Sequence, residues 1–495
     1  MIDNFIAGSL ALFGDPFSIV IFVFGVIGGM LFGAIPGVSM LTLAAILLPF
    51  TANLEPAQGV MLFAVIYCTG TYGGAITAIL FNIPGAPENA PTAFDGYPMT
   101  RKGQSGKAVG AAVLCSAIGG VTSAIVMMAA TEPLANWAIS NIGPPEIFAL
   151  VFFGLAVASS VGGRTLWKGW MSVLLGLLIA TIGQDPVGGI NRYNFGFSDL
   201  AAGIAFVPAI LGFFAVSEIF VQAEKKAIGM YEAPKLSLDF PTILELWTHK
   251  IAVVRSILVG FFCGILPGIG ATLAAFMGYG EAVRWSKNKE SFGKGNLEGV
   301  ISSETANNAA TGAAMIPLLA LGLPGGALTA MMVAVFQMHD LEPGPLVFYN
   351  SPDLIWIVFA AMFYANLSIL FIGLLETKTI LYLLKIPFQF LAPMILLLAS
   401  IGSYIGRGLV LDVMVMFVAG IMGFLLRRSG YSIPGIVLGI ILGKIGEQNF
   451  AQGMQMVHYD LLEYLSRPIC LLLIVAGSLT LLAGIYKALS FSFKS

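Results

Sequence analysis

Charged residues are scarce in this chain. Asp, Glu, Lys and Arg make up 10% of its 495 residues, and no Lys or Arg occurs before Arg101. A soluble domain has about a quarter charged residues, so this chain has too few to cover a water-facing surface. Hydrophobic residues account for 58% and the mean hydropathy is +0.91. The composition excludes a soluble globular protein and predicts an integral membrane protein embedded in a lipid bilayer.

The alternating pattern of membrane β-barrels is also lacking. Apolar segments instead run for about 15 to 25 residues, the length of a membrane-spanning helix. We therefore predict an all-α polytopic membrane protein with roughly 11 to 13 segments that cross or re-enter the bilayer. Clear examples of such segments are Pro16 to Ile35, Val109 to Ala130, Trp356 to Leu375 and Cys470 to Ile485.

Motifs for catalysis are missing as well. The chain has no P-loop, no H-E-x-x-H and no paired intramembrane aspartates, which argues against ATP hydrolysis and against an intramembrane enzyme. We expect no cofactor and no nucleic-acid partner. The histidines are scattered, at His249, His339 and His458. The cysteines lie singly in or beside apolar segments, which predicts packing rather than disulfide or metal roles: Cys68, Cys115, Cys263 and Cys470.

The N-terminus lacks the basic start and the cleavage site of a signal peptide. Its first residues, "MIDNFIAGSLALFGDPF", predict an interfacial helix instead. We expect the headgroup region to bury Phe5, Ile6, Leu10 and Leu12.

What the chain does contain is a duplicated pair of Pro-Gly motifs. The segment "GAIPGVSMLTLAA" from Gly33 has a counterpart in "GILPGIGATLAAF" from Gly264. The segment "YCTGTYGGAITAILFNIPG", Tyr67 to Gly85, aligns without gaps to "NNAATGAAMIPLLALGLPG", Asn307 to Gly325. We predict two repeats, residues 1–222 and 251–495, joined by a linker of residues 223–250.

Basic residues predict how the repeats are oriented, because short cytoplasmic loops collect Lys and Arg. The loop from Thr51 to Pro56 has none, whereas its counterpart carries four: Arg284, Lys287, Lys289 and Lys294. After the second Pro-Gly the signs exchange, since Leu341 to Asn350 has none and repeat one has Arg101, Lys102 and Lys107. Equivalent loops therefore lie on opposite faces, which predicts inverted-topology repeats, a periplasmic N-terminus and a cytoplasmic linker.

The Pro-Gly motifs predict broken helices or re-entrant hairpins within the membrane. Proline removes a backbone donor and glycine allows positive φ, so each pair can end or reverse a helix. A simple proline kink is the better explanation of any one motif taken alone. Paired breaks at corresponding places in inverted repeats are typical of secondary transporters, where helix ends and freed backbone groups bind substrate and ions.

Small polar residues surround these breaks. Neutral oxygens and amides suit a carboxylate substrate and Na⁺ without burying an uncompensated charge, although each hydroxyl could equally bond its own helix. The predicted substrate site comprises Pro36, Gly37, Ser39, Asn82, Pro84, Gly85, Gly268, Thr272, Asn307, Asn308, Thr311, Pro324 and Gly325. A possible Na⁺ site lies near Gly37, Thr42, Tyr72, Gly270 and Asn308.

Three carboxylates lie close to these segments. Glu304 could relay protons or bind a cation, but its proximity to a basic loop favours a helix-start carboxylate at the membrane interface. Glu88 and Asp95 follow the first break in a proline-rich stretch. We interpret that stretch as a loop or re-entrant turn that connects to the basic loop at Arg101, in which a water-facing position is the ordinary explanation of both carboxylates.

Several of these segments resemble one family. "GAIPG", "TYGGAITAILFNIPG", "DGYPM", "GFFAVSEIF", "GILPGIGAT", "ETANNAATGAAMIPLLALGLPG" and "LEPGPLVF" are similar to the large membrane subunit of the tripartite tricarboxylate transporters, in the same order along the chain.

The resemblance implies a multi-pass permease of the bacterial inner membrane that imports small di- or tricarboxylates, coupled to sodium. It also implies two partners, a small membrane subunit and a periplasmic substrate-binding protein. The alternative is a stand-alone sodium-coupled carboxylate carrier.

Overall fold

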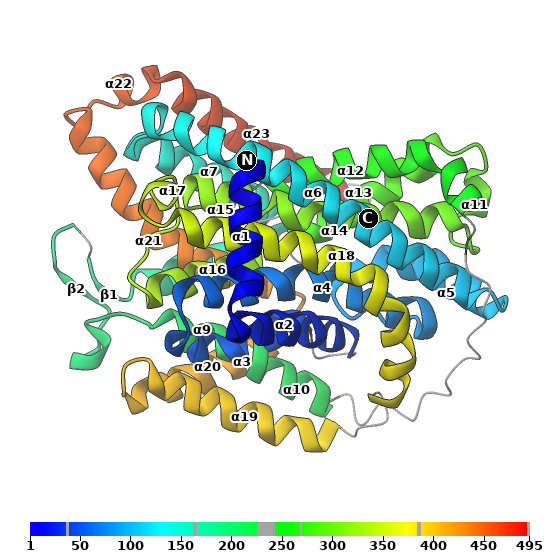
Figure 1. Cartoon of the computed structure of the whole chain (residues 1–495). Coiled ribbons are helices and arrows are strands. Elements are labelled where there is room, and N and C mark those ends of the chain that lie inside the picture. Colours follow the sequence, from blue (N-terminus) through cyan, green and yellow to red (C-terminus); the bar gives the residue numbers. More distant parts are fainter. Residues whose placement is uncertain are drawn as a thin grey trace.

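The computed structural model describes residues 1–35, 39–161, 166–185, 187–224, 241, 243–266, 270–383 and 388–492. Helices dominate these residues (Figure 1). The first half contains α1 (Ile2–Gly14), α2 (Pro16–Ala34), α3 (Met40–Leu47), α4 (Pro56–Phe81), α5 (Ala90–Arg101), α6 (Ser105–Asn141), α7 (Pro144–Val161), α8 (Leu166–Ala180), α9 (Phe206–Ile210) and α10 (Ser217–Glu224). A short antiparallel hairpin, β1 (Gly183–Gln184) and β2 (Asn191–Arg192), follows α8.

The second half continues the all-helical pattern. It contains α11 (Ile243–Thr248), α12 (Lys250–Ile265), α13 (Gly270–Trp285), α14 (Leu297–Ala313), α15 (Met315–Leu321), α16 (Ala327–Met338), α17 (Val347–Asn350), α18 (Pro352–Leu383), α19 (Phe388–Ile405), α20 (Val410–Arg428), α21 (Ile433–Met456), α22 (Leu461–Ser466) and α23 (Pro468–Ser492).

Six helical segments of the described part of the chain are long and apolar enough to cross a membrane. They are Pro16–Ala34, Pro56–Phe81, Ser105–Asn141, Phe206–Glu224, Pro352–Gly373 and Val410–Arg428. Shorter apolar helices of 10–17 residues accompany them. The predicted all-α polytopic architecture is confirmed.

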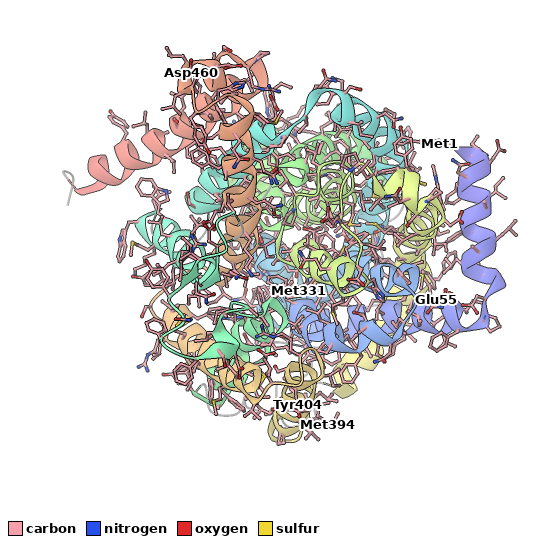
Figure 2. The ribbon with its side chains drawn as sticks, turned by 90° about the vertical axis from the view of Figure 1, so that its left-hand side faces the viewer. Met1, Glu55, Met331, Met394, Tyr404 and Asp460 are labelled. Carbon is pink, nitrogen blue, oxygen red and sulfur yellow. The ribbon has the colours of Figure 1, made fainter. Side chains whose placement is uncertain are left out.

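Two helices form the centre of the molecule. In α4 every residue from Gln58 to Leu80 is buried, and in α14 every residue from Gly299 to Ala313. Helices α2, α6 and α18 pack on α4, while α6, α12 and α13 pack on α14 (Figure 1). Met331 of α16 is also buried and lies near the middle of the view in Figure 2, with Asp460 and Tyr404 toward opposite ends. The segments predicted to surround the site therefore lie in the core.

Glycines allow these helices to approach closely, at equivalent places in the two halves. A Cβ on Gly33 of α2 would lie 2.4 Å from the carbonyl oxygen of Gly70 in α4. A Cβ on Gly264 of α12 would lie 2.6 Å from the carbonyl oxygen of Ala310 in α14. Both distances exclude a side chain, and the positions correspond in the sequence alignment of the repeats. Aligned positions of the two predicted repeats therefore make the same kind of close helix contact.

Helix α1 runs crosswise to α2 (Figure 1). Its burial pattern differs from the prediction. Leu12 is fully buried against the protein and Phe5 stacks edge-on against Phe363 of α18, whereas Ile6 and Leu10 are 50% and 69% exposed. One face of α1 is therefore used for packing on α18, and the opposite face alone is free to contact lipid.

Asp15 joins α1 to α2. Its carboxylate accepts the Ser18 hydroxyl at 2.7 Å and the backbone N–H groups of Phe17 and Ser18, which caps α2. These hydrogen bonds, led by the Ser18 hydroxyl, lower the pKa of Asp15. The cap fixes the corner at which the crosswise helix turns into the first spanning helix.

Loops that the charge pattern places on one membrane face are in contact. The Lys102 ammonium donates to the carbonyl of Lys294 at 2.6 Å. On the predicted opposite face, Gly59 lies beside His339, whose Nε2 would be 3.4 Å from a Cβ at that glycine.

Candidate functional site

The first break follows α4. Asn82 adopts a left-handed conformation with φ of 58°, and the N–H of Ile83 donates to the carbonyl of Thr77, so the helix ends in a closed cap. The chain then folds back, because the N–H of Gly85 donates to the carbonyl of Gly74 at 3.3 Å. A Cβ on Gly85 would lie 1.9 Å from the carbonyl oxygen of Gly33, so only glycine fits there.

The second break repeats this geometry at the aligned residues. Gly322 ends α15 with φ of 74°, and the N–H of Leu323 donates to the carbonyl of Pro317. Gly325 packs on Ala314, whose oxygen would lie 2.9 Å from an added Cβ. In the alignment, Leu323 and Pro317 correspond to Ile83 and Thr77 of the first break. Gly325 and Ala314 correspond to Gly85 and Gly74. Beside these turns, Pro84 is half-buried and Pro324 is buried.

Asn307 and Asn308 lie in the fully buried α14. The Asn308 amide donates to the side-chain oxygen of Asn307 at 2.7 Å and to the carbonyl of Glu304 at 3.0 Å. Its own side-chain oxygen has no hydrogen-bond partner among the described residues. Thr311 donates to the carbonyl of Asn308, a bond within the helix. An unpartnered buried oxygen of this kind is available to a bound cation.

The two halves meet at Glu88. The Asn307 amide donates to the Glu88 carbonyl, and the Thr272 hydroxyl donates to the Glu88 carboxylate, both at 3.4 Å. Thr272 lies in the first turn of α13. Gly270 begins that helix, with the carbonyl oxygen of Gly325 about 3.7 Å from its ideal Cβ position. The start of α13, the second break and the segment after the first break are thus neighbours.

The structure brings several predicted residues together at this meeting point. They are Gly270, Thr272, Asn307, Asn308, Thr311, Pro324 and Gly325, with Gly85 at the start of the segment that leads to Glu88.

Other predicted residues lie apart from it. Ser39 caps α3 through its carbonyl, which accepts the N–H of Thr42, and Thr42 itself is buried. The Tyr72 hydroxyl donates to the carbonyl of Gly373 in α18 at 3.0 Å. Asn82 is exposed. Pro36, Gly37 and Gly268 lie outside the described residues.

Three predictions about carboxylates are wrong. Glu304 and Asp95 are fully buried and Glu88 is 6% exposed, so none of them is a water-facing group. Residues 90–101, expected to be a loop, form helix α5. The Asp95 carboxylate accepts the N–H groups of Gly295 and Asn296, each at 2.8 Å, and the Tyr279 hydroxyl at 2.9 Å. It therefore ties α5 to the loop before α14.

Sequence reasoning missed two partners of Glu304. Thr92 of α5 donates to Glu304 Oε1 at 2.5 Å and Ser116 of α6 donates to Oε2 at 2.9 Å. The spacing of Glu88, Thr92 and Asp95 contained the signal, because polar residues at intervals of three and four predict one face of a helix. The prolines in "APENAPTAFDGYP" favoured a loop, so the helical spacing of these polar residues was not used.

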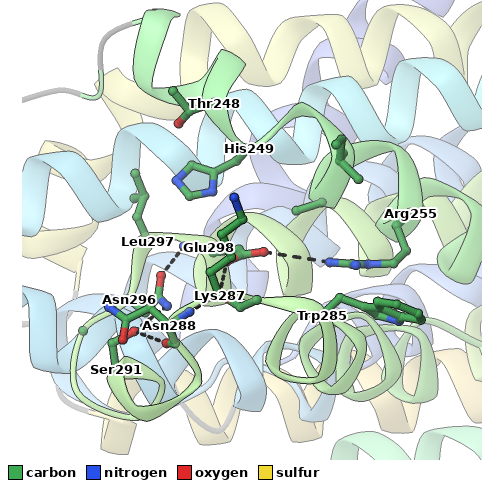
Figure 3. A pocket seen from close by; sticks show the side chains of 14 residues that line it. Thr248, His249, Arg255, Trp285, Lys287, Asn288, Ser291, Asn296, Leu297 and Glu298 are labelled. Carbon is green, nitrogen blue, oxygen red and sulfur yellow. Dashed lines mark hydrogen bonds and ion pairs between the residues drawn. The ribbon is translucent and has the colours of Figure 1, made fainter.

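A polar pocket of about 590 Å³ opens at the N-terminal end of α12 (Figure 3). Arg255 and Glu298 face each other across it at 3.9 Å, and His249, Trp285 and Lys287 are among its lining residues. Of its basic residues, Arg255 is opposed by the Glu298 carboxylate.

The fold and the paired breaks define a polytopic α-helical membrane protein of the transporter type. The sequence profile of the tripartite tricarboxylate transporter TctA family matches residues 19–438. The chain belongs to this family, and the predicted resemblance is confirmed.

Two proteins of Agrobacterium vitis are similar to the chain. One, described as an uncharacterized 52.8 kDa protein in the TAR-I ttuC' 3' region, is 36% identical over 469 residues, which cover 93% of this chain and 92% of the relative. The other, from the TAR-II ttuC' 3' region, is 36% identical over 218 residues, 44% of this chain and 90% of the relative. No solved structure matches the chain.

Proposed function

We propose that this protein is the permease subunit of a binding-protein-dependent secondary transporter that imports small organic di- or tricarboxylates together with sodium. The observation that carries the proposal is the pair of equivalent helix breaks at Asn82–Gly85 and Gly322–Gly325, in a chain of the TctA family. Broken helices supply free backbone groups inside the membrane, where they are tolerated if they line a site.

In this proposal the two repeats have inverted topology. Two contacts support it: Lys102 with the loop at Lys294, and Gly59 with His339. The first joins loops that follow the second break of repeat one and the first break of repeat two. The second joins Gly59, which follows the first break of repeat one, to His339, which follows the second break of repeat two. The basic loops are assigned to the cytoplasm of a bacterial inner membrane and the N-terminus to the periplasm.

The substrate is held between the breaks. Carboxylate groups bind at the N-terminal end of α13, where backbone N–H groups and the helix dipole favour an anion. Sodium binds the neutral oxygens, including the unpartnered side-chain oxygen of Asn308. Its positive charge offsets the negative charges of the substrate and of Glu88, because the described contacts to Glu88 come from an amide and a hydroxyl rather than from basic groups.

A periplasmic binding protein delivers the substrate in this proposal, and a small membrane subunit completes the complex. The TctA family is named for a tripartite system, which supports the presence of partner subunits.

Reconstitution tests the proposal. Proteoliposomes containing this chain, the small subunit and the binding protein should accumulate labelled tricarboxylate when an inward sodium gradient is imposed. Omitting the binding protein should abolish uptake. Full uptake without it would favour a stand-alone carrier, and uptake that persists after replacement of sodium by choline would contradict sodium coupling.

A further inference from the structure

Glu304 is a buried carboxyl group without a cationic partner in the part of the chain that the structure describes. It is fully buried near the middle of α14, and no ion pair involves it. An ionised carboxylate in such surroundings is costly unless it is neutralised, and ionisable residues inside membrane proteins commonly mark proton pathways.

Side chains of three helices donate hydrogen bonds to this carboxyl group. Oε1 accepts Thr92 of α5 at 2.5 Å and Asn307 of α14 at 3.3 Å, while Oε2 accepts Ser116 of α6 at 2.9 Å. Thr92 and Ser116 belong to the first repeat and Glu304 to the second. The group therefore lies where the two halves meet, next to the Asn307 amide that also contacts Glu88.

The hydroxyl groups around Glu304 can reverse their direction. Thr92 Oγ1 and Ser303 Oγ are 3.0 Å apart and either can donate to the other, and Ser303 can donate onward to the carbonyl of Gly299. When Oε1 carries a proton, its O–H donates to Thr92, and the Thr92 hydroxyl turns to donate to Ser303. Each hydroxyl keeps one donated bond, so the proton is gained without leaving a buried donor unpaired.

Protonation changes one contact that reaches the proposed transport site. The neutral acid accepts the Asn307 N–H less strongly than the carboxylate does, because hydrogen bonds to ionised groups are about twice as strong. Asn307 is then free to strengthen its bond to the Glu88 carbonyl or to release it for a ligand.

Charged groups on the neighbouring helices are committed elsewhere. Arg255 faces Glu298, Lys107 pairs with Glu245, and Arg284 faces Glu281. Arg101 and Lys250 are exposed. Other titratable groups that the structure describes on helices near Glu304 carry no positive charge. They are Tyr67, Cys68, Glu88, Asp95, Cys115, Cys263 and Tyr279.

We propose that Glu304 is a proton-binding site whose loading and release are coupled to carboxylate transport. The inference rests on the proposed transport function and adds a proton to its ions. Thr92 and Ser116 are positioning residues for this carboxyl group.

The test uses the complete three-component transporter in proteoliposomes that enclose a pH-sensitive dye. Wild type should move protons with labelled tricarboxylate and show a pH-dependent uptake rate. Glu304→Gln should abolish the coupled proton movement and flatten the pH profile, while exchange of labelled for unlabelled substrate persists. Glu463→Gln, which replaces an exposed carboxylate of α22, is the matched control and should keep the wild-type profile.

A second variant covers the case in which Glu304→Gln does not fold. Thr92→Val keeps the carboxyl group but removes the reversible hydroxyl, and it should move the midpoint of the pH profile by about one unit, the effect of one such hydrogen bond. Proton movement that survives in Glu304→Gln, or wild-type transport without any proton movement, would overturn the inference. A wild-type complex that transports no carboxylate would instead refute the proposed function.

Discussion

Replacing Gly85 by alanine tests how tightly the first break is packed against the end of α2. The new Cβ would lie 1.9 Å from the carbonyl oxygen of Gly33 and 2.7 Å from the Cα of Gly74. Ordinary contact begins at 3.4 Å, so the backbone must move by about 1.5 Å. Overpacking of this kind destabilises by about 1–3 kcal/mol, and misplacing a site's positioning groups by about 1 Å can lower a rate by about 10²-fold.

Two further alanine variants give a graded comparison. At Gly325, the equivalent position of the second repeat, the Cβ would lie 2.9 Å from atoms of Ala314, so the required shift is smaller. A Cβ added at Gly14 would have no other atom within 4 Å. Uptake by proteoliposomes should therefore fall most for Gly85→Ala, less for Gly325→Ala and not at all for Gly14→Ala. Normal uptake by Gly85→Ala would refute the packing of the first break.

Three further predictions concern buried polar groups. Asp412→Ala should lower the thermal unfolding temperature in detergent, because it leaves the half-buried Arg407 without its carboxylate partner, a loss of about 1.5–3 kcal/mol; Arg407→Leu in the same chain should restore much of it. Asp95→Asn should weaken the tie between α5 and the loop before α14 by about 1.5–3 kcal/mol, measured in the same assay; an unchanged transition would refute this role. Asn308→Ala should raise the sodium concentration for half-maximal uptake about tenfold, the effect of about 1.4 kcal/mol; normal transport would count against the site.

The fold could be predicted largely because the sequence patterns are strong. Long apolar segments identified the spanning helices, and the gapless alignment of Tyr67–Gly85 with Asn307–Gly325 identified both breaks. The structure gives the aligned residues Asn82 and Gly322 the same left-handed conformation. A cap of this type depends on local sequence, so a local alignment is enough to find it.

The environment of the carboxylates could not be predicted in the same way. Glu304 is seven residues from the start of α14, close enough in sequence to suggest an interfacial position. Its burial depends on α5 and α6, which come from the other half of the chain and supply Thr92 and Ser116. Non-local packing of this kind leaves no pattern within the segment itself. Prolines at the start of α5 also led us to predict a loop where the chain forms a helix.

The central claim is that substrate binds where the two breaks and the start of α13 meet, and thiol labelling tests it most directly. Thr272→Cys places a half-buried thiol beside Glu88, in a chain whose four native cysteines have been replaced by alanine or serine. We predict that a tricarboxylate together with sodium slows the reaction of this thiol with a small reagent, and leaves labelling of Gly14→Cys unchanged. Equal labelling rates at Thr272→Cys with and without substrate and sodium, in a complex that transports, would contradict the claim.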